Sequence, residues 1–371
     1  MNLLNQYLTD KLNERTEAGN LRTLKTNRAA VDFFSNDYLG IATNRLLVGG
    51  DSGESGATGS RLLSGNHIFT EQTEQYIAAF HHAEAALLFN SGYDANLGLL
   101  SCIANRHTTI LYDELCHASI IDGIRLSQCN RKYRFAHNNL PDLAAQIAKY
   151  CNAGPVVVVT ESVFSMDGDL APLAAMAKLC QNTGAQLIVD EAHATGIFGL
   201  HGRGLVCALG LEDRVFARVH TYGKALGCHG AAVVGSALLV QYLINFARSF
   251  IYTTALPGHS VATIARAYAY LSSPGFTNQP LHDLIDYFRN QITHHNLQGW
   301  TDSRSPIQAL IVADNERCKQ LAACLQNHGL QVNPILHPTV PQGMERLRIC
   351  LHTYNTTRQI DILMNVIAGK G

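Results

Sequence analysis

The segments PVVVVTE (155–161) and AQLIVDE (185–191) decide the fold of this chain. Each is a short apolar run that ends in a carboxylate and lacks the alternation of apolar and polar residues typical of half-exposed strands. Such runs indicate parallel strands that are covered on both faces. A helix-like stretch over 173–183 separates the two runs. The pattern predicts a doubly wound α/β sheet, whose ligands bind at the carboxyl ends of its strands.

The segments on either side continue this alternation. Strands are expected over AALLF (85–89), TTILYD (108–113), VFARVH (215–220) and AAVVG (231–235), and helices over 71–81, 95–104, 117–127 and 238–247. No formal charge lies between Lys224 and Arg248, a stretch long enough to resemble a membrane span. Its glycines, His229 and Gln241 favour a buried strand followed by a core helix instead.

The length of 371 residues predicts two domains. Residues 1–45 are expected to form an N-terminal amphipathic helix and a connecting segment, and 46–273 a large α/β domain. The turn cluster SSPG (272–275) marks a change of character. Beyond it, a helix over 281–292, strands within 306–314 and 347–352 and a helix over 318–328 predict a small α+β domain, residues 274–371.

Composition limits the possible partners and the compartment. The formal net charge is -1, from 28 basic and 29 acidic residues, so a nucleic-acid or membrane-surface partner is not indicated. The 10 cysteines are scattered singly without a C-x-x-C pair, which argues against a zinc ribbon or a disulfide scaffold. Free thiols and the absence of a secretory signal pattern at the N-terminus favour a cytoplasmic protein.

Polar residues follow the predicted strands at the edge where a ligand would bind. Ser91 and Gly92 follow AALLF at a helix start, where free N–H groups and the helix dipole suit a phosphate; a plain helix cap uses the same residues. His117 follows TTILYD and could stack on an aromatic ligand or cap the helix. Ser165 lies in the polar segment after PVVVVTE, for which a simple turn is the alternative.

Two further segments carry the strongest chemical signals. Asp190 ends a buried strand with His193 three residues on, a pair that fits either a metal site or a carboxylate facing a pyridine nitrogen. Lys224 lies in the glycine-rich, otherwise uncharged segment HTYGKALG (220–227). Burial would lower the pKa of such a lysine and make it a better amine nucleophile. Together these positions predict phosphate, ring-stacking, ring-nitrogen and Schiff-base roles in chain order.

Seven segments together resemble the α-oxoamine synthases, a family of fold-type I PLP-dependent transferases. They are SNDYLG (35–40), GATGSRLLSGNH (56–67), DELCHASIIDGIRLS (113–127), TESVFSMDGDLAPL (160–173), VDEAHATGIFGLHGRGL (189–205), HTYGKALG (220–227) and FIYTTALP (250–257). They run in family order and span most of the chain. The resemblance implies pyridoxal 5'-phosphate (PLP) as the cofactor, and a large domain with a mostly parallel sheet beside a smaller C-terminal α+β domain.

The resemblance also assigns roles to residues. Lys224 would form the Schiff base, Asp190 would pair with the pyridine nitrogen, and His193, with Ser165 nearby, would contact the phenolic oxygen of the ring. His117 would stack on the ring. The remaining assignments are to the phosphate (Ser91, Gly92, Tyr93 and Thr221, with Thr253 or Thr254 from the second subunit of a homodimer) and to the substrates (Arg22, Asn36 and Arg348).

The activity implied is acyl transfer with decarboxylation. L-Alanine and a pimeloyl thioester, the substrates of a biotin-pathway step, are the expected pair, and the thiol could belong to coenzyme A or to a carrier protein. A family member that uses glycine or serine, a PLP aminotransferase or decarboxylase, a non-catalytic subunit and a zinc enzyme are the alternatives. Retention of Lys224, Asp190, His193 and His117 argues against a non-catalytic subunit.

Three segments depart from the family pattern. The stretch 41–55 is short, which predicts a truncated helix before the glycine-rich loop. Gly258 follows Pro257 where the family has a double proline, and Cys350-Leu351-His352-Thr353 replaces the usual continuation after Arg348. These departures concern the acyl-chain contacts more than the cofactor chemistry.

Overall fold

The computed structural model describes residues 2–24, 26, 31–49 and 55–369. Its contacts divide the chain into two compact units. The larger unit comprises Asn36–Ser165 and Leu170–Leu281, and the smaller comprises Met1–Ser35, Met166–Asp169 and His282–Gly371. The N-terminal segment, expected as a piece of its own, therefore groups with the C-terminal part of the chain, and the division falls at Ser35 and Leu281.

The larger unit is built on a seven-stranded sheet with the order β2-β8-β7-β6-β5-β3-β4. The strands are β2 (Ala85–Phe89), β3 (Thr109–Asp113), β4 (Arg131–Phe135), β5 (Val156–Glu161), β6 (Gln186–Asp190), β7 (Ala217–Thr221) and β8 (Ala231–Gly235). Only β8 runs antiparallel to its neighbours, β2 and β7. The sheet is thus mostly parallel, and the expected fold class is confirmed.

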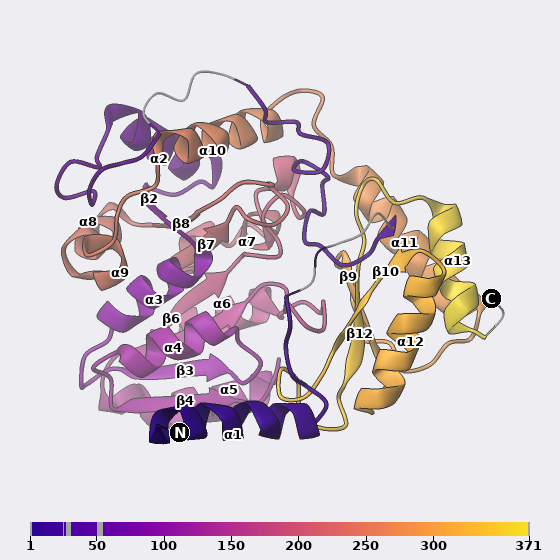
Figure 1. Cartoon of the computed structure of the whole chain (residues 1–371). Helices are drawn as coiled ribbons and strands as arrows, with labels where there is room; N and C mark the ends of the chain where they lie inside the picture. The colour runs from indigo at the N-terminus through magenta and orange to yellow at the C-terminus, as the bar shows by residue number, and fades with distance from the viewer. Residues whose placement is uncertain (1, 25, 27–30, 50–54, 370–371) are drawn as a thin grey trace. The chain divides into compact units, whose positions relative to one another are not determined.

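Helices cover both faces of this sheet (Figure 1). They are α2 (Ile68–Phe80), α3 (Gly92–Cys102), α4 (Ala118–Leu126), α5 (Leu140–Tyr150), α6 (Leu173–Thr183), α7 (Leu205–Ala208), α8 (Ala237–Phe246), α9 (Arg248–Ile251) and α10 (Gly258–Leu271). Short 3-10 turns occupy Cys151–Ala153, Leu200–Gly202 and Glu212–Arg214.

Strand β5 shows why the central segments are apolar throughout. Val157 and Val159 pack in a core with residues of α3, α4, α8 and α9, whereas Val156 and Val158 pack in a second core with residues of α5, α6 and α7. Successive side chains of a strand point to opposite faces, so a strand with helices on both sides needs apolar residues at every position.

The smaller unit contains an antiparallel sheet of the order β11-β12-β9, built from β9 (Ile307–Ile311), β11 (Asn333–Ile335) and β12 (Arg346–Cys350). A parallel pair joins β1 (Val31–Asp32) to β10 (Leu330–Gln331), which ties the N-terminal segment into this unit. The helices outside the larger unit are α1 (Leu3–Glu17), α11 (Gln279–His294), whose first turn belongs to the larger unit, α12 (Asn315–Asn327) and α13 (Thr357–Ile367).

The structure adds elements that the sequence pattern left unassigned, among them β4, α5, α10 and α13. Strand β4, RKYRF, is an edge strand whose charged residues are partly exposed, so it lacks the apolar run that marks a central strand. Helix α3 begins at Gly92, three residues earlier than expected. Within the stretch 41–55, where a truncated helix was expected, residues 41–47 form turns and residues 50–54 lie outside the described residues.

The uncharged segment between Lys224 and Arg248 forms the buried strand β8 and the helix α8, as the glycine pattern predicted. Among the described residues, no helix is long and apolar enough to cross a bilayer.

Candidate active site

A cavity of ≈ 260 Å³ lies at the carboxyl edge of the sheet in the larger unit. Most of the residues that the sequence singled out line it: Asn36, Ser91, Gly92, Tyr93, His117, Asp190, His193, Thr221 and Lys224. They come from segments that are far apart in the chain and meet because parallel strands end at one edge of the sheet.

Lys224 is held on the short connection between β7 and β8. The Tyr222 N–H donates to Gly230 O at 3.0 Å and the Cys228 N–H donates to Tyr222 O at 2.8 Å, which closes the connection into a loop. Gly227 has φ +59°, and a Cβ there would lie 2.6 Å from the backbone nitrogen of Ala42. The glycines around the lysine therefore allow the backbone conformation that directs Lys224 into the cavity.

His193 contacts the lysine directly. Its Nε2 lies 2.9 Å from Lys224 Nζ, and its Nδ1 lies 2.8 Å from the hydroxyl of buried Tyr38. Tyr38 donates its hydroxyl proton to Asn36 Oδ1 at 2.9 Å, which leaves the phenol oxygen to accept from His193 Nδ1. His193 Nε2 is then the acceptor for the lysine amine. The SNDYLG segment thus sets the orientation of the histidine.

Asp190 is 5% exposed and ends β6 with both oxygens engaged. Its Oδ1 accepts from the Ala192 N–H at 2.8 Å, and its Oδ2 accepts from Asn96 Nδ2 at 2.7 Å. Donors to both oxygens hold the carboxyl group in one orientation. Asp190 is therefore arranged as a positioned acceptor on the wall of the cavity.

His117 is the N-cap of α4, and its ring lines the cavity. Its Nδ1 lies 2.8 Å from Ser119 Oγ, and Ser119 Oγ accepts from Asn96 Nδ2 at 3.0 Å. Ser119 accordingly donates to Nδ1, and the His117 proton lies on Nε2. Because Asn96 also donates to Asp190, one amide fixes both the carboxylate and the imidazole.

The first turn of α3 forms a cradle for an anion. Ser91 caps the helix by accepting from the Asp94 N–H, and the first N–H groups of a helix have no partners within the helix. A Cβ at Gly92 would lie 2.4 Å from Thr221 Cγ2, so the helix start packs against the end of β7 only with glycine there. Gly92, Tyr93 and Thr221 thereby border one corner of the cavity.

We expect Gly92→Ala to weaken PLP binding about tenfold, because the new methyl group would push α3 away from Thr221. Thr221→Ser removes Cγ2 and keeps the hydroxyl, so the double variant Gly92→Ala/Thr221→Ser should recover most of the affinity. Gly275→Ala, at a glycine with open space around it, is the matched control. Fluorescence titration with PLP measures all four; a double variant as weak as Gly92→Ala would contradict this packing argument.

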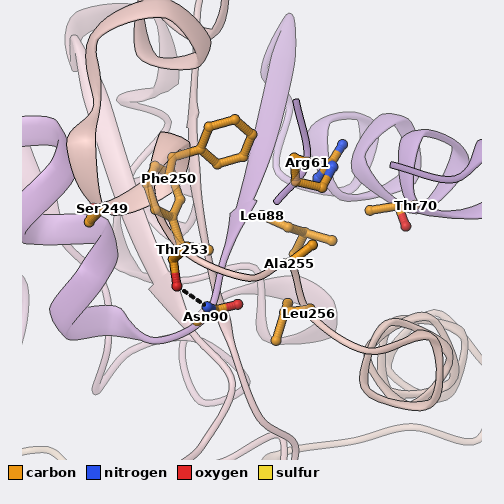
Figure 2. Close-up of a pocket in the computed structure, with 10 residues that line it drawn as sticks. Arg61, Thr70, Leu88, Asn90, Ser249, Phe250, Thr253, Ala255 and Leu256 are labelled. Carbon is orange, nitrogen blue, oxygen red and sulfur yellow. Dashed lines mark hydrogen bonds between the residues drawn. The ribbon is translucent and has the colours of Figure 1, made fainter. Parts of the chain in front are cut away.

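Thr253 and Thr254 do not line the cavity of their own chain. Asn90 Nδ2 donates to Thr253 Oγ1 at 3.0 Å and to Thr254 O at 2.8 Å. Figure 2 shows the Asn90–Thr253 bond in a separate hollow of ≈ 20 Å³, beside Phe250 and Arg61. The side chain of Thr254 is exposed.

The other predicted residues lie outside the cavity lining. Ser165 is half-buried at the end of a segment of the larger unit. Arg22 and Arg348 belong to the smaller unit. There, exposed Arg22 donates to Thr339 Oγ1 at 3.0 Å, and Arg348, 8% exposed on β12, donates to Cys350 Sγ at 2.9 Å.

The cavity also contains residues that the sequence reading did not assign: Asn96, Ser119, Glu161 and His229. Asn96 lies one turn inside α3 and Ser119 is the second residue of α4, and their spacing from Ser91 and His117 is the only sequence signal that could have indicated them. Among the residues that the structure describes, no three His, Cys, Asp or Glu side chains are grouped to hold a metal ion. Both carboxyl oxygens of Asp190 instead accept hydrogen bonds from amide N–H groups.

Comparison with known proteins agrees with this geometry. The family model for aminotransferase class I and II matches residues 29–367. An 8-amino-7-oxononanoate synthase of Emericella nidulans is 41% identical over 370 residues, covering 92% of this chain and 89% of that protein.

Solved structures of two enzymes illustrate the likeness in fold. A serine palmitoyltransferase variant from S. paucimobilis with a bound PLP–myriocin aldimine is 27% identical, with a TM-score of 0.90 over 100% of this chain and 98% of that one. An 8-amino-7-oxononanoate synthase from Francisella tularensis is 30% identical, with a TM-score of 0.79 over 93% and 98%. The chain therefore belongs to the aminotransferase class I and II family, and within it to the α-oxoamine synthases, the group that includes 8-amino-7-oxononanoate synthase.

Proposed function

We propose that this chain is a PLP-dependent acyltransferase that condenses L-alanine with a pimeloyl thioester to give 8-amino-7-oxononanoate, a step of biotin biosynthesis. The observation that carries the proposal is the cavity that Lys224, His193 and Asp190 line together. His193 contacts the lysine amine, and Asp190 accepts a hydrogen bond from Asn96. The 41% identity to a protein of that name supports the choice of substrates. Ten free thiols favour the cytoplasm as its compartment.

The residues of the cavity fit PLP group by group. The α3 cradle at Ser91, Gly92 and Tyr93, with the Thr221 hydroxyl beside it, suits a phosphate. Asp190 suits a protonated pyridine nitrogen because its carboxylate favours that proton. Lys224 provides the amine that an aldehyde requires. No metal ligand set competes with this assignment among the described residues.

PLP, when bound, supplies an electron sink for the charge that develops at the amino-acid Cα. Lys224 would hold the cofactor covalently until the amino group of alanine takes the place of its amine. The freed amine of Lys224 then takes the proton from Cα, and it returns a proton to that carbon at the end. His193, whose Nε2 lies 2.9 Å from Nζ, keeps the amine in place and would lie near the phenolic oxygen of the ring.

In the proposed reaction one carbon–carbon bond forms as a carbon–sulfur bond breaks, and a second carbon–carbon bond then breaks. The Cα of alanine forms a bond with the thioester carbonyl carbon while the carbon–sulfur bond breaks and the thiol leaves. The bond from Cα to the carboxylate then breaks, and carbon dioxide departs. His117, whose imidazole orientation is fixed through Ser119 and Asn96, would cover the ring face. A fixed ring orientation matters because the breaking bond must stand perpendicular to the ring plane.

We assign substrate carboxylates to the two arginines of the smaller unit and a polar contact to Asn36. Arg348 is buried on β12, and its guanidinium donates a hydrogen bond to Cys350 Sγ. We assign the carboxylate of alanine to this arginine. Arg22, which is exposed, would bind the pimeloyl carboxylate. Arginine suits both roles because its planar fork matches a carboxylate.

We further propose a homodimer whose cavities are completed by the partner. Thr254 is exposed and Thr253 is directed to Asn90, so neither reaches the phosphate cradle of its own chain. Exposed Leu238, Tyr242 and Phe246 on α8 offer apolar surface for a subunit contact. Light scattering should give twice the chain mass of 40.5 kDa; a monomer with full activity would contradict this arrangement.

The structural likeness to serine palmitoyltransferase supports a second candidate, a family member that uses serine and a longer acyl thioester. Both candidates share the cofactor chemistry and differ in the amino acid and the acyl chain. We favour alanine because the identity to the 8-amino-7-oxononanoate synthase is higher and side chains, not the backbone path, select substrates.

The deciding experiment is absorbance titration of the purified protein with PLP, then with L-alanine, glycine and L-serine. A band near ~420 nm that borohydride removes indicates the lysine–cofactor link. A new transient band that requires both pimeloyl thioester and L-alanine supports the proposal. A response confined to glycine or serine would keep the family and reject the substrates, and the absence of any band with added PLP would reject the function.

A further inference from the structure

Glu161 is a buried carboxyl group of the cavity to which neither the motif pattern nor the mechanism above gives a role. It ends β5, is 3% exposed, and lines the cavity beside Asp190. β5 and β6 are parallel, and Glu161 pairs in register with Asp190. Neighbouring strands lie about 4.8 Å apart and paired residues point to the same face, so the two carboxyl groups are adjacent.

Glu161 is also hydrogen-bonded to the backbone of His117, the residue whose imidazole would cover the ring. Its Oε1 accepts from the His117 backbone N–H at 2.6 Å. Asp190, Asn96, Ser119 and His117 are already joined by hydrogen bonds, and this contact brings the end of β5 into the same network. Glu161 therefore lies between the carboxylate that faces the ring nitrogen and the residue that faces the ring plane.

Two adjacent buried carboxyl groups are not both charged without a compensating cation. Asp190 receives two donors, whereas the bond from the His117 backbone is the contact described for Glu161. Burial, followed by the charge of Asp190, raises the pKa of Glu161 to about 8. Asp113 on β3 acts in the same direction, and Lys224 opposes it.

We propose that Glu161 is the charge-compensating residue of the cofactor site. It is uncharged beside Asp190 when the ring is absent, it gives up its proton when a protonated ring lies against Asp190, and it holds the His117 backbone in both states. This inference rests on PLP as the cofactor. Because Glu161 loses a proton as the protonated ring binds, the summed charge of Glu161, Asp190 and the ring is nearly the same before and after binding. Neither state then contains an additional uncompensated buried charge.

The test is the pH dependence of PLP affinity in the wild type and in Glu161→Gln, whose amide keeps the acceptor for His117 and cannot ionise. Proton release and affinity are linked, so each proton released strengthens binding tenfold per pH unit. Between pH 6.5 and 8 the ratio of the Kd of the variant to that of the wild type should therefore rise several-fold. Calorimetry in two buffers of different ionisation enthalpy should show fewer protons released by the variant.

Two further variants separate charge from position. Glu161→Asp keeps the charge and is one methylene too short for His117, so its affinity should fall at every pH while the pH slope remains. Glu191→Gln is the matched control: that carboxyl is also buried, accepts from Leu205 N and Val206 N, and lies outside the cavity lining. Its curve should run parallel to that of the wild type.

A cofactor-free measurement gives an independent reading. The pKa of Glu161 is raised from 4.5 to about 8 by folding, so its contribution to stability is full below about pH 4.5 and is lost as the pH rises through 8. The unfolding temperature of the wild type should therefore fall more than that of Glu161→Gln between pH 6 and 9.

Parallel affinity curves for the wild type and Glu161→Gln, or equal proton release, would overturn the inference and leave the proposed function standing. Failure of the wild type to bind PLP at any pH would instead overturn the proposed function.

Discussion

Lys224→Ala will bind PLP without forming the covalent link, and its turnover will fall by at least about 10³-fold, because the substitution removes both the amine nucleophile and the base that takes the Cα proton. The structure adds a reason for so large a loss: His193 Nε2, 2.9 Å from Nζ, is placed to contact this amine, and among the described residues no other lysine lines the cavity. The band near ~420 nm should be absent, and borohydride should fix no cofactor to the chain.

The matched control is Lys178→Ala, an exposed lysine on α6 of the same unit. It should retain the band and the turnover of the wild type. Mass spectrometry of the borohydride-treated wild type should place the cofactor on the peptide that contains Lys224. Cofactor attached at another lysine, or turnover in Lys224→Ala within tenfold of the wild type, would contradict the assignment.

Asp190→Asn should retain the covalent link and lose turnover by about 10²–10⁴-fold. An asparagine cannot hold the negative charge that keeps the ring nitrogen protonated, so the electron sink is weakened. The neutral amide can still accept from Ala192, but it directs an N–H toward the Asn96 amide, which is also a donor. The phosphate cradle at Ser91 and Gly92 is untouched, so PLP affinity should fall far less than turnover.

Absorbance and steady-state rates on the same samples measure the two effects separately. Asp190→Glu, which keeps the charge and shifts its position, should recover part of the rate. Asp213→Asn, at an exposed aspartate, is the control for loss of a carboxylate without a contact in the cavity. Turnover of Asp190→Asn within tenfold of the wild type would show that the ring nitrogen depends on another group.

Much of the fold follows from local sequence. The apolar runs of β5 and β6 and their lengths indicate strands covered on both faces, and the structure has them at Val156–Glu161 and Gln186–Asp190. β4 escaped this reasoning because an edge strand needs little apolar surface, so RKYRF has no periodic signal. The reversal of β8 against β7 also escaped, since a short connection and an apolar strand are compatible with either direction until pairing is known.

The residues of the site divide in the same way. Lys224, Asp190, His193, His117 and the Ser91–Gly92 turn are indicated by sequence because each lies directly after a strand or in a distinctive glycine pattern. Strand topology predicted that they lie at one edge of the sheet, and in the structure these residues line one cavity; their roles stay predictions.

Sequence by itself determined the strand-and-helix order and the chemical types at the strand ends, because both are written in local periodicity and residue identity. Only the tertiary structure decided which groups share a proton or a hydrogen bond. Asn96 bridges Asp190 and Ser119, and Glu161 lies beside Asp190, although the partners in these contacts are 23 to 94 positions apart in the chain. Such contacts depend on the register of strands and the packing of helices, which place distant residues within a few ångströms and leave no mark in the sequence around either one.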